Sequence, residues 1–174
     1  MTLELKNFSS GVADKKVIRE EILAFEKLFQ QIPSAVHGDN DLMPLTHKFC
    51  DGFYIREIFI PKDMILTGRI HISEHPNFLL EGEVDVFTES GGVEHLVAPM
   101  SIVSAAGTKR VVRSYSDTRW CTVHLNPTNT RDIKKLDRMI IAESYEAYEK
   151  IKKIESRKKY LRDGIQLIKK FFKR

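Results

Sequence analysis

Between Phe53 and His124 the sequence divides into short apolar segments, and this feature constrains the fold more than any other. The segments read FYIREIFI, MILTGRIHI, NFLLEGEVDVF, EHLVAPMSIVSA, KRVVRSYS and RWCTVHL, with turn-forming stretches such as IPKD, SEHP, SGG and AAGT between them. No helical pattern separates these segments, whereas parallel strands need long crossover connections. The sequence therefore predicts an antiparallel sandwich or barrel with an all-β core.

Helical periodicity is confined to the two ends of the chain. Between Asp14 and Gln31 apolar residues recur at helical spacing, and Pro33 ends the pattern. A loop rich in turn formers, PSAVHGDNDLMPLTHK, is expected to follow. After Pro127 apolar residues recur in steps of three and four, with interruptions at Ser144 and Lys158. These positions are Ile133, Leu136, Ile140, Ala147, Ile151, Ile154, Leu161, Ile165, Ile168 and Phe172.

The C-terminal pattern predicts one long helix or a pair of helices. The expected break is Asp163-Gly164, because Gly destabilises a helix interior by about 1 kcal/mol relative to Ala. The spacing suits packing against another helix, so we expect a homo-oligomer formed through the C-terminal helices. Packing of the same apolar face against the β domain or the N-terminal helix explains the pattern equally well.

The length of the chain limits the number of domains. Its 174 residues, 42% of them hydrophobic, suffice for one filled core but not for two ordinary domains and a tail. We expect an N-terminal helical segment and loop over residues 1–45, a β domain over 46–128 and a basic helical tail over 129–174. The first residues lack the apolar core of a signal peptide, and no apolar run reaches membrane-spanning length, so a cytoplasmic location is expected.

The net charge of +4 is unevenly distributed along the chain. Residues 131–174 hold fifteen Lys and Arg against seven Asp and Glu, which leaves the preceding residues with a net negative charge. The basic tail is a candidate for contact with nucleic acid or an anionic membrane, although a solvated helix face explains most such runs. Basicity therefore gives no information about a ligand of the β domain.

The segment GRIHISEHPNFLLEGEVDVF, residues 68–87, holds the main candidate site residues. Because side chains alternate along a strand, Arg69 and His71 share one face. Pro76 and the β-branched neighbours argue against a helix, so we expect a hairpin in which His71 ends one strand and His75 begins the next. The segment therefore predicts two imidazoles and a guanidinium inside the lumen.

This segment resembles the first motif of the cupin superfamily, which consists of small jelly-roll barrels. That motif reads G, five residues, H-x-H, three or four residues, E, six residues, G. Gly82 corresponds to the closing glycine, His75 to the Glu ligand, and Arg69 and His71 to the two His positions. The stretch APMSIVSAAGTKRVVRS resembles a degenerate second motif, with Arg110 in the place of the last His.

The resemblance extends to small cupin-like proteins carried by bacteriophages. Together with the helical patterns, it implies a mainly β chain that forms a single cupin-like jelly-roll barrel, with an N-terminal helix and long C-terminal helices. A location in the host cytoplasm or the virion is then expected.

A divalent transition metal bound in the lumen is one interpretation of the site. Such a metal needs three or four imidazole or carboxylate ligands. His71 and His75 supply two, and His124 is the candidate third, with Glu57 and His95 as alternatives. This interpretation makes the chain a metal-dependent cupin enzyme, such as an isomerase, dioxygenase or lyase, whose catalytic residues the sequence does not identify.

A small anionic molecule is the second interpretation. Arg69 and Arg110 occupy expected ligand positions, and a guanidinium repels a cation but binds carboxylate or phosphate. Tyr115 and Trp120 would serve as flat walls for a nucleotide-like or carboxylated molecule. The ligand-binding residues would then be Arg69, His71, His75, Arg110, Tyr115 and Trp120.

A third interpretation leaves the lumen without a ligand. Arg69 would then lie at the rim of the barrel, paired with Glu83 or Asp85, and the histidines would be ordinary interior residues. The domain would serve as a viral or cellular assembly scaffold joined through its C-terminal helices.

Overall fold

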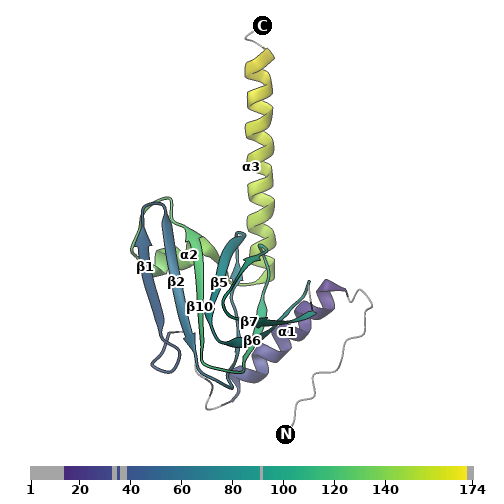
Figure 1. Cartoon of the computed structure of the whole chain (residues 1–174). Coiled ribbons are helices and arrows are strands. Elements are labelled where there is room, and N and C mark those ends of the chain that lie inside the picture. Colours follow the sequence, from purple (N-terminus) through teal and green to yellow (C-terminus); the bar gives the residue numbers. More distant parts are fainter. Residues whose placement is uncertain (1–13, 33–34, 36–38, 91, 172–174) are drawn as a thin grey trace.

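The computed structural model describes residues 14–32, 35, 39–90 and 92–171. These residues form mainly β-strands, with helices at both ends (Figure 1). The helices are α1 (Lys15–Gln30), α2 (Ile133–Ile140) and α3 (Tyr145–Phe171). The strands are β1 (Leu45–Cys50), β2 (Phe53–Ile60), β3 (Ile65–Thr67), β4 (Ile70–His71), β5 (His75–Glu81), β6 (Glu83–Thr88), β7 (Gly92–Val97), β8 (Met100–Ser104), β9 (Arg110–Ser114), β10 (Thr118–Leu125) and β11 (Ile141–Ala142). The predicted class, mainly β with helices at the two ends, is confirmed.

The strand order is that of a jelly roll. A five-stranded antiparallel sheet has the order β1-β2-β10-β5-β8, and a four-stranded antiparallel sheet has the order β3-β9-β6-β7. The strands pair in a nested series, β2 with β10, β3 with β9, β5 with β8 and β6 with β7. A long hairpin rolled up on itself gives this series, with each pair assigned to one of the two sheets. The predicted cupin-like jelly roll agrees with this order.

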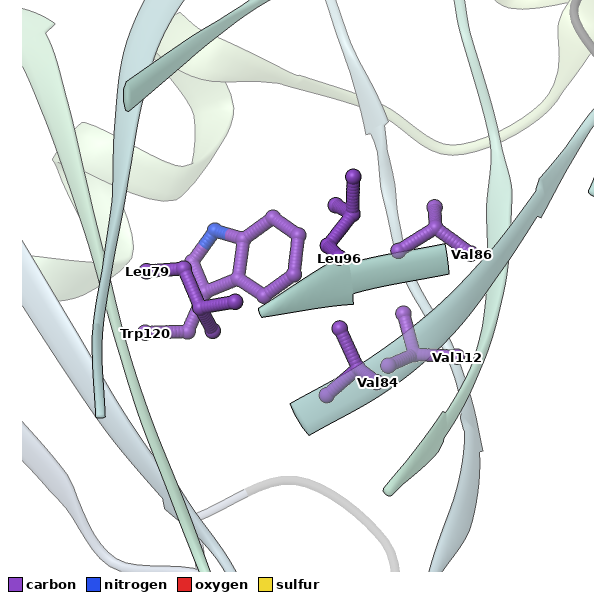
Figure 2. Close-up of a cluster of buried hydrophobic side chains, with 6 residues drawn as sticks. All are labelled: Leu79, Val84, Val86, Leu96, Val112 and Trp120. Atoms are coloured by element: carbon purple, nitrogen blue, oxygen red, sulfur yellow. The ribbon is translucent and has the colours of Figure 1, made fainter. Parts of the chain in front are cut away.

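Side chains from both sheets meet in one core cluster (Figure 2). Leu79 and Trp120 come from the five-stranded sheet, and the remaining buried members come from the four-stranded sheet. Those members are Val84, Val86, Leu96 and Val112. Alternate residues of β6 are buried, as expected for a strand with one face on the core. Full burial of such a side chain contributes about 1.5–3 kcal/mol, so this cluster holds the sheets face to face.

Helix α1 is the amphipathic helix predicted from Asp14 to Gln31, and that prediction is confirmed. It begins after Asp14, whose side chain accepts a hydrogen bond from the backbone of Lys16. Its carboxylate Glu26 pairs with the buried Lys109 at 2.8 Å and accepts from the Thr67 hydroxyl at 3.0 Å. These contacts fix α1 against β3 and the turn before β9.

The C-terminal pattern is divided earlier than the sequence predicts. Helix α2 ends at Ile140, because the next two residues form β11 and pair with β4, Ile141 opposite His71. Ser144 then caps α3 by accepting a hydrogen bond from the backbone of Ala147 at 3.1 Å. The predicted break at Asp163-Gly164 is wrong, since α3 continues through Gly164, where an added Cβ would meet no atom within 4 Å.

Helix α3 extends away from the two sheets (Figure 1). Phe172, the last residue of the predicted apolar pattern, lies outside the described residues. No helix in the described part of the chain is both long enough and apolar enough to cross a membrane.

The loop predicted over residues 33–48 is wrong in its last four residues, which form part of β1. Leu45 begins β1, which pairs with β2 in the register Leu45 opposite Ile58. β1 is an edge strand whose residues alternate between half-buried and exposed, and its pattern is therefore weakly apolar. Part of the predicted loop, including His37, lies outside the described residues.

Candidate metal centre

His71 is held at the edge of the jelly roll by two segments distant in sequence. His71 pairs with Ile141 of β11, and its carbonyl oxygen accepts a hydrogen bond from the backbone of Gly107 at 2.8 Å. β4 ends at His71 and β5 begins at His75, as predicted, but the predicted hairpin is wrong, because β4 pairs with β11 whereas β5 pairs with β10 and β8. The two imidazole rings lie 4.3 Å apart between centroids.

His75 and His124 lie on neighbouring strands and on the same face of the sheet. In the register between β5 and β10, Leu79 lies opposite Trp120 and Asn77 opposite Thr122. Continuing this register by two residues brings His75 to His124, and their ring centroids are 4.5 Å apart. Both side chains are buried, like the inward-facing Leu79 and Trp120. Strand alternation therefore directs both imidazoles between the sheets.

The three imidazoles form one compact cluster. His71 and His124 stack with 4.8 Å between ring centroids, and one ring nitrogen from each of the three residues lies within 4.8 Å of the other two. Among the described residues, Nδ1 of His71 and Nε2 of His75 and His124 are buried and have no hydrogen-bond partner. Buried polar atoms of this kind are rare in folded proteins and need an explanation.

The histidines of this cluster are neutral. Burial, together with the neighbouring histidines and the charges of Arg56 and Arg110, lowers the pKa of His71 to about 2. Burial likewise lowers the pKa of His124 to about 3, and it also lowers the pKa of His75. A neutral imidazole has a lone pair on one ring nitrogen, which is the form that binds metals.

The cluster fits a transition metal in number and type of ligand. Three imidazoles are a common donor set for zinc and suit copper, iron and nickel as well. Bonds of about 2.1 Å require ligand nitrogens roughly 3.4 Å apart in tetrahedral geometry, so the rings would move inward by about 1 Å on binding. His75 and His124 lie on adjacent strands and His71 on the short β4, which makes His71 the most adjustable of the three.

Of the candidate third ligands, His124 alone joins His71 and His75. Glu57 instead pairs with Arg119, with 2.9 Å between the carboxylate and Nε. His95 contacts Asp85 at 2.7 Å and Glu83 at 3.2 Å, on the face of the four-stranded sheet that is opposite to the core. His124 reaches the cluster because it lies on the same face of β10 as the buried Trp120.

The two arginines of the predicted site differ in position. Arg110 lines a cavity beside the cluster, donates to Asn77 Oδ1 at 3.4 Å and to Ser104 Oγ, and lies 5.7 Å from the ring of Trp120. Arg69 lies at the edge of the same cavity, with a half-exposed side chain bonded to Asp137 at 2.8 Å. The expectation that Arg69 pairs with Glu83 or Asp85 at the rim is therefore wrong.

The two aromatic residues of the predicted site are also separated. Trp120 lines the cavity, and its indole Nε1 donates to Asn77 Oδ1 at 3.0 Å. Tyr115 is not among the residues that line the cavity. Its hydroxyl donates to Asp85 at 2.6 Å. Tyr115 therefore belongs to the group of side chains around His95, on the face of the four-stranded sheet that is opposite to the core. Only one of the two expected flat walls is present.

Arg56 is a site residue that the sequence reasoning missed. It lies on β2, lines the cavity, and shares the inward face with Tyr54 and Ile58. No hydrogen bond or ion pair of its guanidinium is found among the described residues. The signal was present in FYIREIFI, where an arginine occupies the same parity as apolar residues that become buried.

The cavity next to the cluster has a volume of about 660 Å³. Its walls come from both sheets and from α1, which contributes Phe29. Arg56, His71 and Arg110 line one part, whereas aliphatic side chains such as Ile58 and Val112 line another. Cavities of this size are typical of small-molecule sites.

Comparisons with known proteins give structural matches only. No protein-family model matches the chain, and no curated protein is significantly similar to it in sequence. Solved structures that match include KdgF from Halomonas (9% identity, TM-score 0.45, covering 56% of this chain and 88% of that one). A cupin superfamily protein from Desulfitobacterium hafniense matches at 10% identity with a TM-score of 0.42, covering 54% and 86% of the two chains.

A further match is a putative ethanolamine utilization protein from Salmonella typhimurium (15% identity, TM-score 0.42, covering 53% and 81%). These scores are too low to support an inference about function. The fold assignment rests on the nested strand pairs, and the site rests on its own geometry.

Proposed function

We propose that this chain binds a divalent transition metal through His71, His75 and His124 and holds a small anionic molecule beside it in the cavity. The observation that supports the proposal is the convergence of three buried ring nitrogens without partners. An unsatisfied buried polar group costs about 1–3 kcal/mol, and a bound metal would satisfy all three at once.

The environment also supports the anionic part of the proposal. Arg56 and Arg110 raise the positive charge next to the imidazoles, which disfavours a metal alone. An anion that contacts both the metal and a guanidinium would offset this repulsion. The proposed site is therefore a metal and anion pair, in which each component favours the other.

A metal-dependent enzyme is the second candidate function. It is favoured by the number of protein ligands, because catalytic metal sites keep a coordination position open for water or substrate. A metal held by three imidazoles would act as a Lewis acid towards an oxygen of the bound anion. Arg56 and Arg110 would orient that anion, and Trp120 would limit its approach from the core side.

Metal analysis tests the proposal. The full chain is stripped with a chelator, incubated separately with Mn, Fe, Ni and Zn salts, and assayed for bound metal by mass spectrometry. We expect about one ion per chain for at least one metal, as a single three-ligand centre predicts. His124→Gln should weaken binding at least tenfold, and the exposed His95→Gln serves as the matched control.

Two results would contradict the metal site. One is the absence of stoichiometric binding for all four metals by a chain that remains folded. The other is equal weakening by His124→Gln and His95→Gln, which would assign the metal to surface histidines.

A further inference from the structure

The inner part of the cavity holds two guanidinium groups that are not paired with a carboxylate among the described residues, although the charges of Glu94 and Glu89 act on Arg110 at longer range. The guanidinium of Arg56 has no hydrogen bond or ion pair among the described residues, and that of Arg110 is bonded only to the neutral side chains Asn77 and Ser104. Of the acidic residues that line the cavity, Glu26 is already paired with Lys109, and Asp63 is exposed. In the described part of the chain, two guanidinium groups of a partly buried site therefore have no carboxylate bonded to them.

The rest of the cavity is lined mainly by apolar side chains. The aliphatic and aromatic side chains that line it come from both sheets, α1 and the segment before β1. They include Phe29, Met43, Ile58, Ile60, Leu66 and Val112. A ligand that fits both parts has an anionic head and a hydrocarbon body. A nucleotide fits poorly, because the sugar and base of a nucleotide would face aliphatic side chains. Tyr115, one of the two aromatic residues expected to stack on a base, does not line the cavity.

We propose that the cavity binds a carboxylate with an apolar body of medium-chain length, with its head on Arg56 and Arg110. This proposal rests on the proposed function, since it names the class of the anion beside the metal. A planar carboxylate matches the fork of donors on a guanidinium. The volume of about 660 Å³ is ample for an eight-carbon acid.

The test measures binding of octanoate by calorimetry to the full chain after metal removal. Octanol, octylamine and acetate are the matched probes, because each lacks either the anionic head or the apolar body. We expect octanoate to bind at least tenfold more tightly than any of the three. Arg56→Gln should remove most of this preference, whereas Arg113→Gln, which replaces an exposed arginine of β9, should leave it unchanged.

Equal binding of octanoate and octanol, or no effect of Arg56→Gln on a folded protein, would overturn the ligand class. The metal assay is read separately on the same samples. Octanoate binding without metal binding would support this inference and contradict the proposed metal site, so the two failures are distinguishable.

A second inference concerns α3 and rests on separate observations. Beyond its first turns, the helix exposes an apolar stripe, with Ile154, Leu161 and Ile165 53%, 62% and 51% exposed. From Ala147 to Ile165 the stripe advances in alternating steps of four and three residues, the spacing of a two-stranded coiled coil, with Lys158 as its one charged position. Ile151 packs against the domain, so the uncovered part is the projecting half (Figure 1).

The charges beside the stripe discriminate between two orientations of a second copy. In a parallel pair, Arg157 would face the partner's Arg162, and Lys158 would meet the partner's Lys158 in the seam. In an antiparallel pair, Glu155 would face the partner's Arg162 twice by symmetry, and Lys158 would lie opposite the partner's Leu161. The antiparallel arrangement replaces the repulsion between arginines with attraction between Glu155 and Arg162, and it removes the contact between the two Lys158 side chains.

We infer that α3 pairs antiparallel with α3 of a second copy of this chain. The test is the molar mass of the full chain in solution, measured by sedimentation over a range of concentrations. We expect a dimer, and Ile154→Glu with Leu161→Glu should give a monomer. Arg162→Glu should weaken the dimer severalfold, and the added change Glu155→Arg should restore it.

A monomeric wild-type chain at high concentration would overturn this inference. A dimer strengthened by Arg162→Glu would also overturn it, because that change creates attraction to Arg157 only in a parallel pair.

Discussion

The imidazole of His75 and the backbone of Ser73 are joined by a hydrogen bond, with 3.1 Å between Nδ1 and the carbonyl oxygen. A carbonyl oxygen only accepts, so Nδ1 carries the proton and Nε2 has the free lone pair. Nε2 is also the atom that is buried without a partner beside the other two histidines. The turn between β4 and β5 therefore fixes the tautomer that suits metal binding, as the outer hydrogen bonds of metal ligands commonly do.

Stability of the metal-free protein should fall as the pH is lowered below about 6.5. The pKa of His71 is about 2 and that of His124 about 3, so in this range the unfolded chain binds more protons than the folded one. Each such histidine lowers the free energy of unfolding by up to about 1.4 kcal/mol per pH unit. Urea unfolding at pH 7, 6 and 5 measures the slope, and His71→Gln should reduce it.

His95 provides a control with the opposite sign. Its hydrogen bond to Asp85 raises its pKa, so its contribution to stability is present at low pH and is lost as the pH rises through the raised value. His95→Gln should therefore make the protein less stable mainly on the acidic side and leave the alkaline side unchanged. If His71→Gln and His95→Gln altered the dependence of stability on pH in the same way, the opposite pKa shifts assigned to these two histidines would be contradicted.

Gly82, the glycine that closes the sequence motif, should not tolerate a side chain. Its φ is +98°, and an added Cβ would lie 2.7 Å from the carbonyl oxygen of Asp117 and 2.8 Å from Cα of Thr118. Gly82→Ala should cost about 1–2 kcal/mol for the backbone conformation and about 1–3 kcal/mol more for the overlap. Gly52, at φ +77° with no atom within 4 Å of an added Cβ, should show the first cost alone. Thermal unfolding of the two alanine variants makes the comparison.

Glu26→Gln should loosen α1 from the β domain. The Lys109 ammonium that Glu26 pairs with is almost fully buried, and a neutral amide would leave it without a carboxylate. We expect a loss of about 1–3 kcal/mol in unfolding free energy and faster proteolysis of the α1 segment. Asp137→Asn, which disrupts the more exposed pair with Arg69, should cost less than about 1 kcal/mol. Similar losses for both variants would argue against a structural role for the Lys109 pair.

Leu79→Ala measures the strength of the contact between the sheets. Leu79 is fully buried in the core cluster, and Leu to Ala changes at such positions cost about 2–5 kcal/mol. Leu125→Ala, at an exposed position of β10, should stay within about 0.5 kcal/mol. Chemical unfolding with a two-state fit gives both values.

Strand alternation explains why the histidine cluster was predictable. His71 and His75 flank a turn with clear sequence signals, and His124 has the parity of Trp120, which the core requires to be inside. Arg56 has the same kind of parity, yet an arginine between apolar residues was not recognised as inward-facing. Arg69 has inward parity as well, but it lies where the sheet ends, so α2 could supply Asp137 as its partner.

The helix boundaries differ from the predicted ones where tertiary contacts outweigh the helix propensity of the local sequence. Gly164 lowers helix propensity by a small amount, and nothing else in its surroundings opposes the helix. Ile141 and Ala142 are compatible with a helix but gain hydrogen bonds and burial by pairing with β4. That gain depends on a strand far away in sequence, so no local pattern could reveal it.

The nested pairing also sets an order of events during synthesis on the ribosome. β2 emerges early and must wait for β10, its partner, while the innermost pair β6 and β7 can form as soon as its turn is made. His124 lies on β10, and β11, which pairs with His71, follows it in the chain, so the three imidazoles cannot come together in a nascent chain until the roll closes. We therefore expect metal capture to follow closure of the β domain rather than to guide it, and chelators should slow neither translation nor collapse.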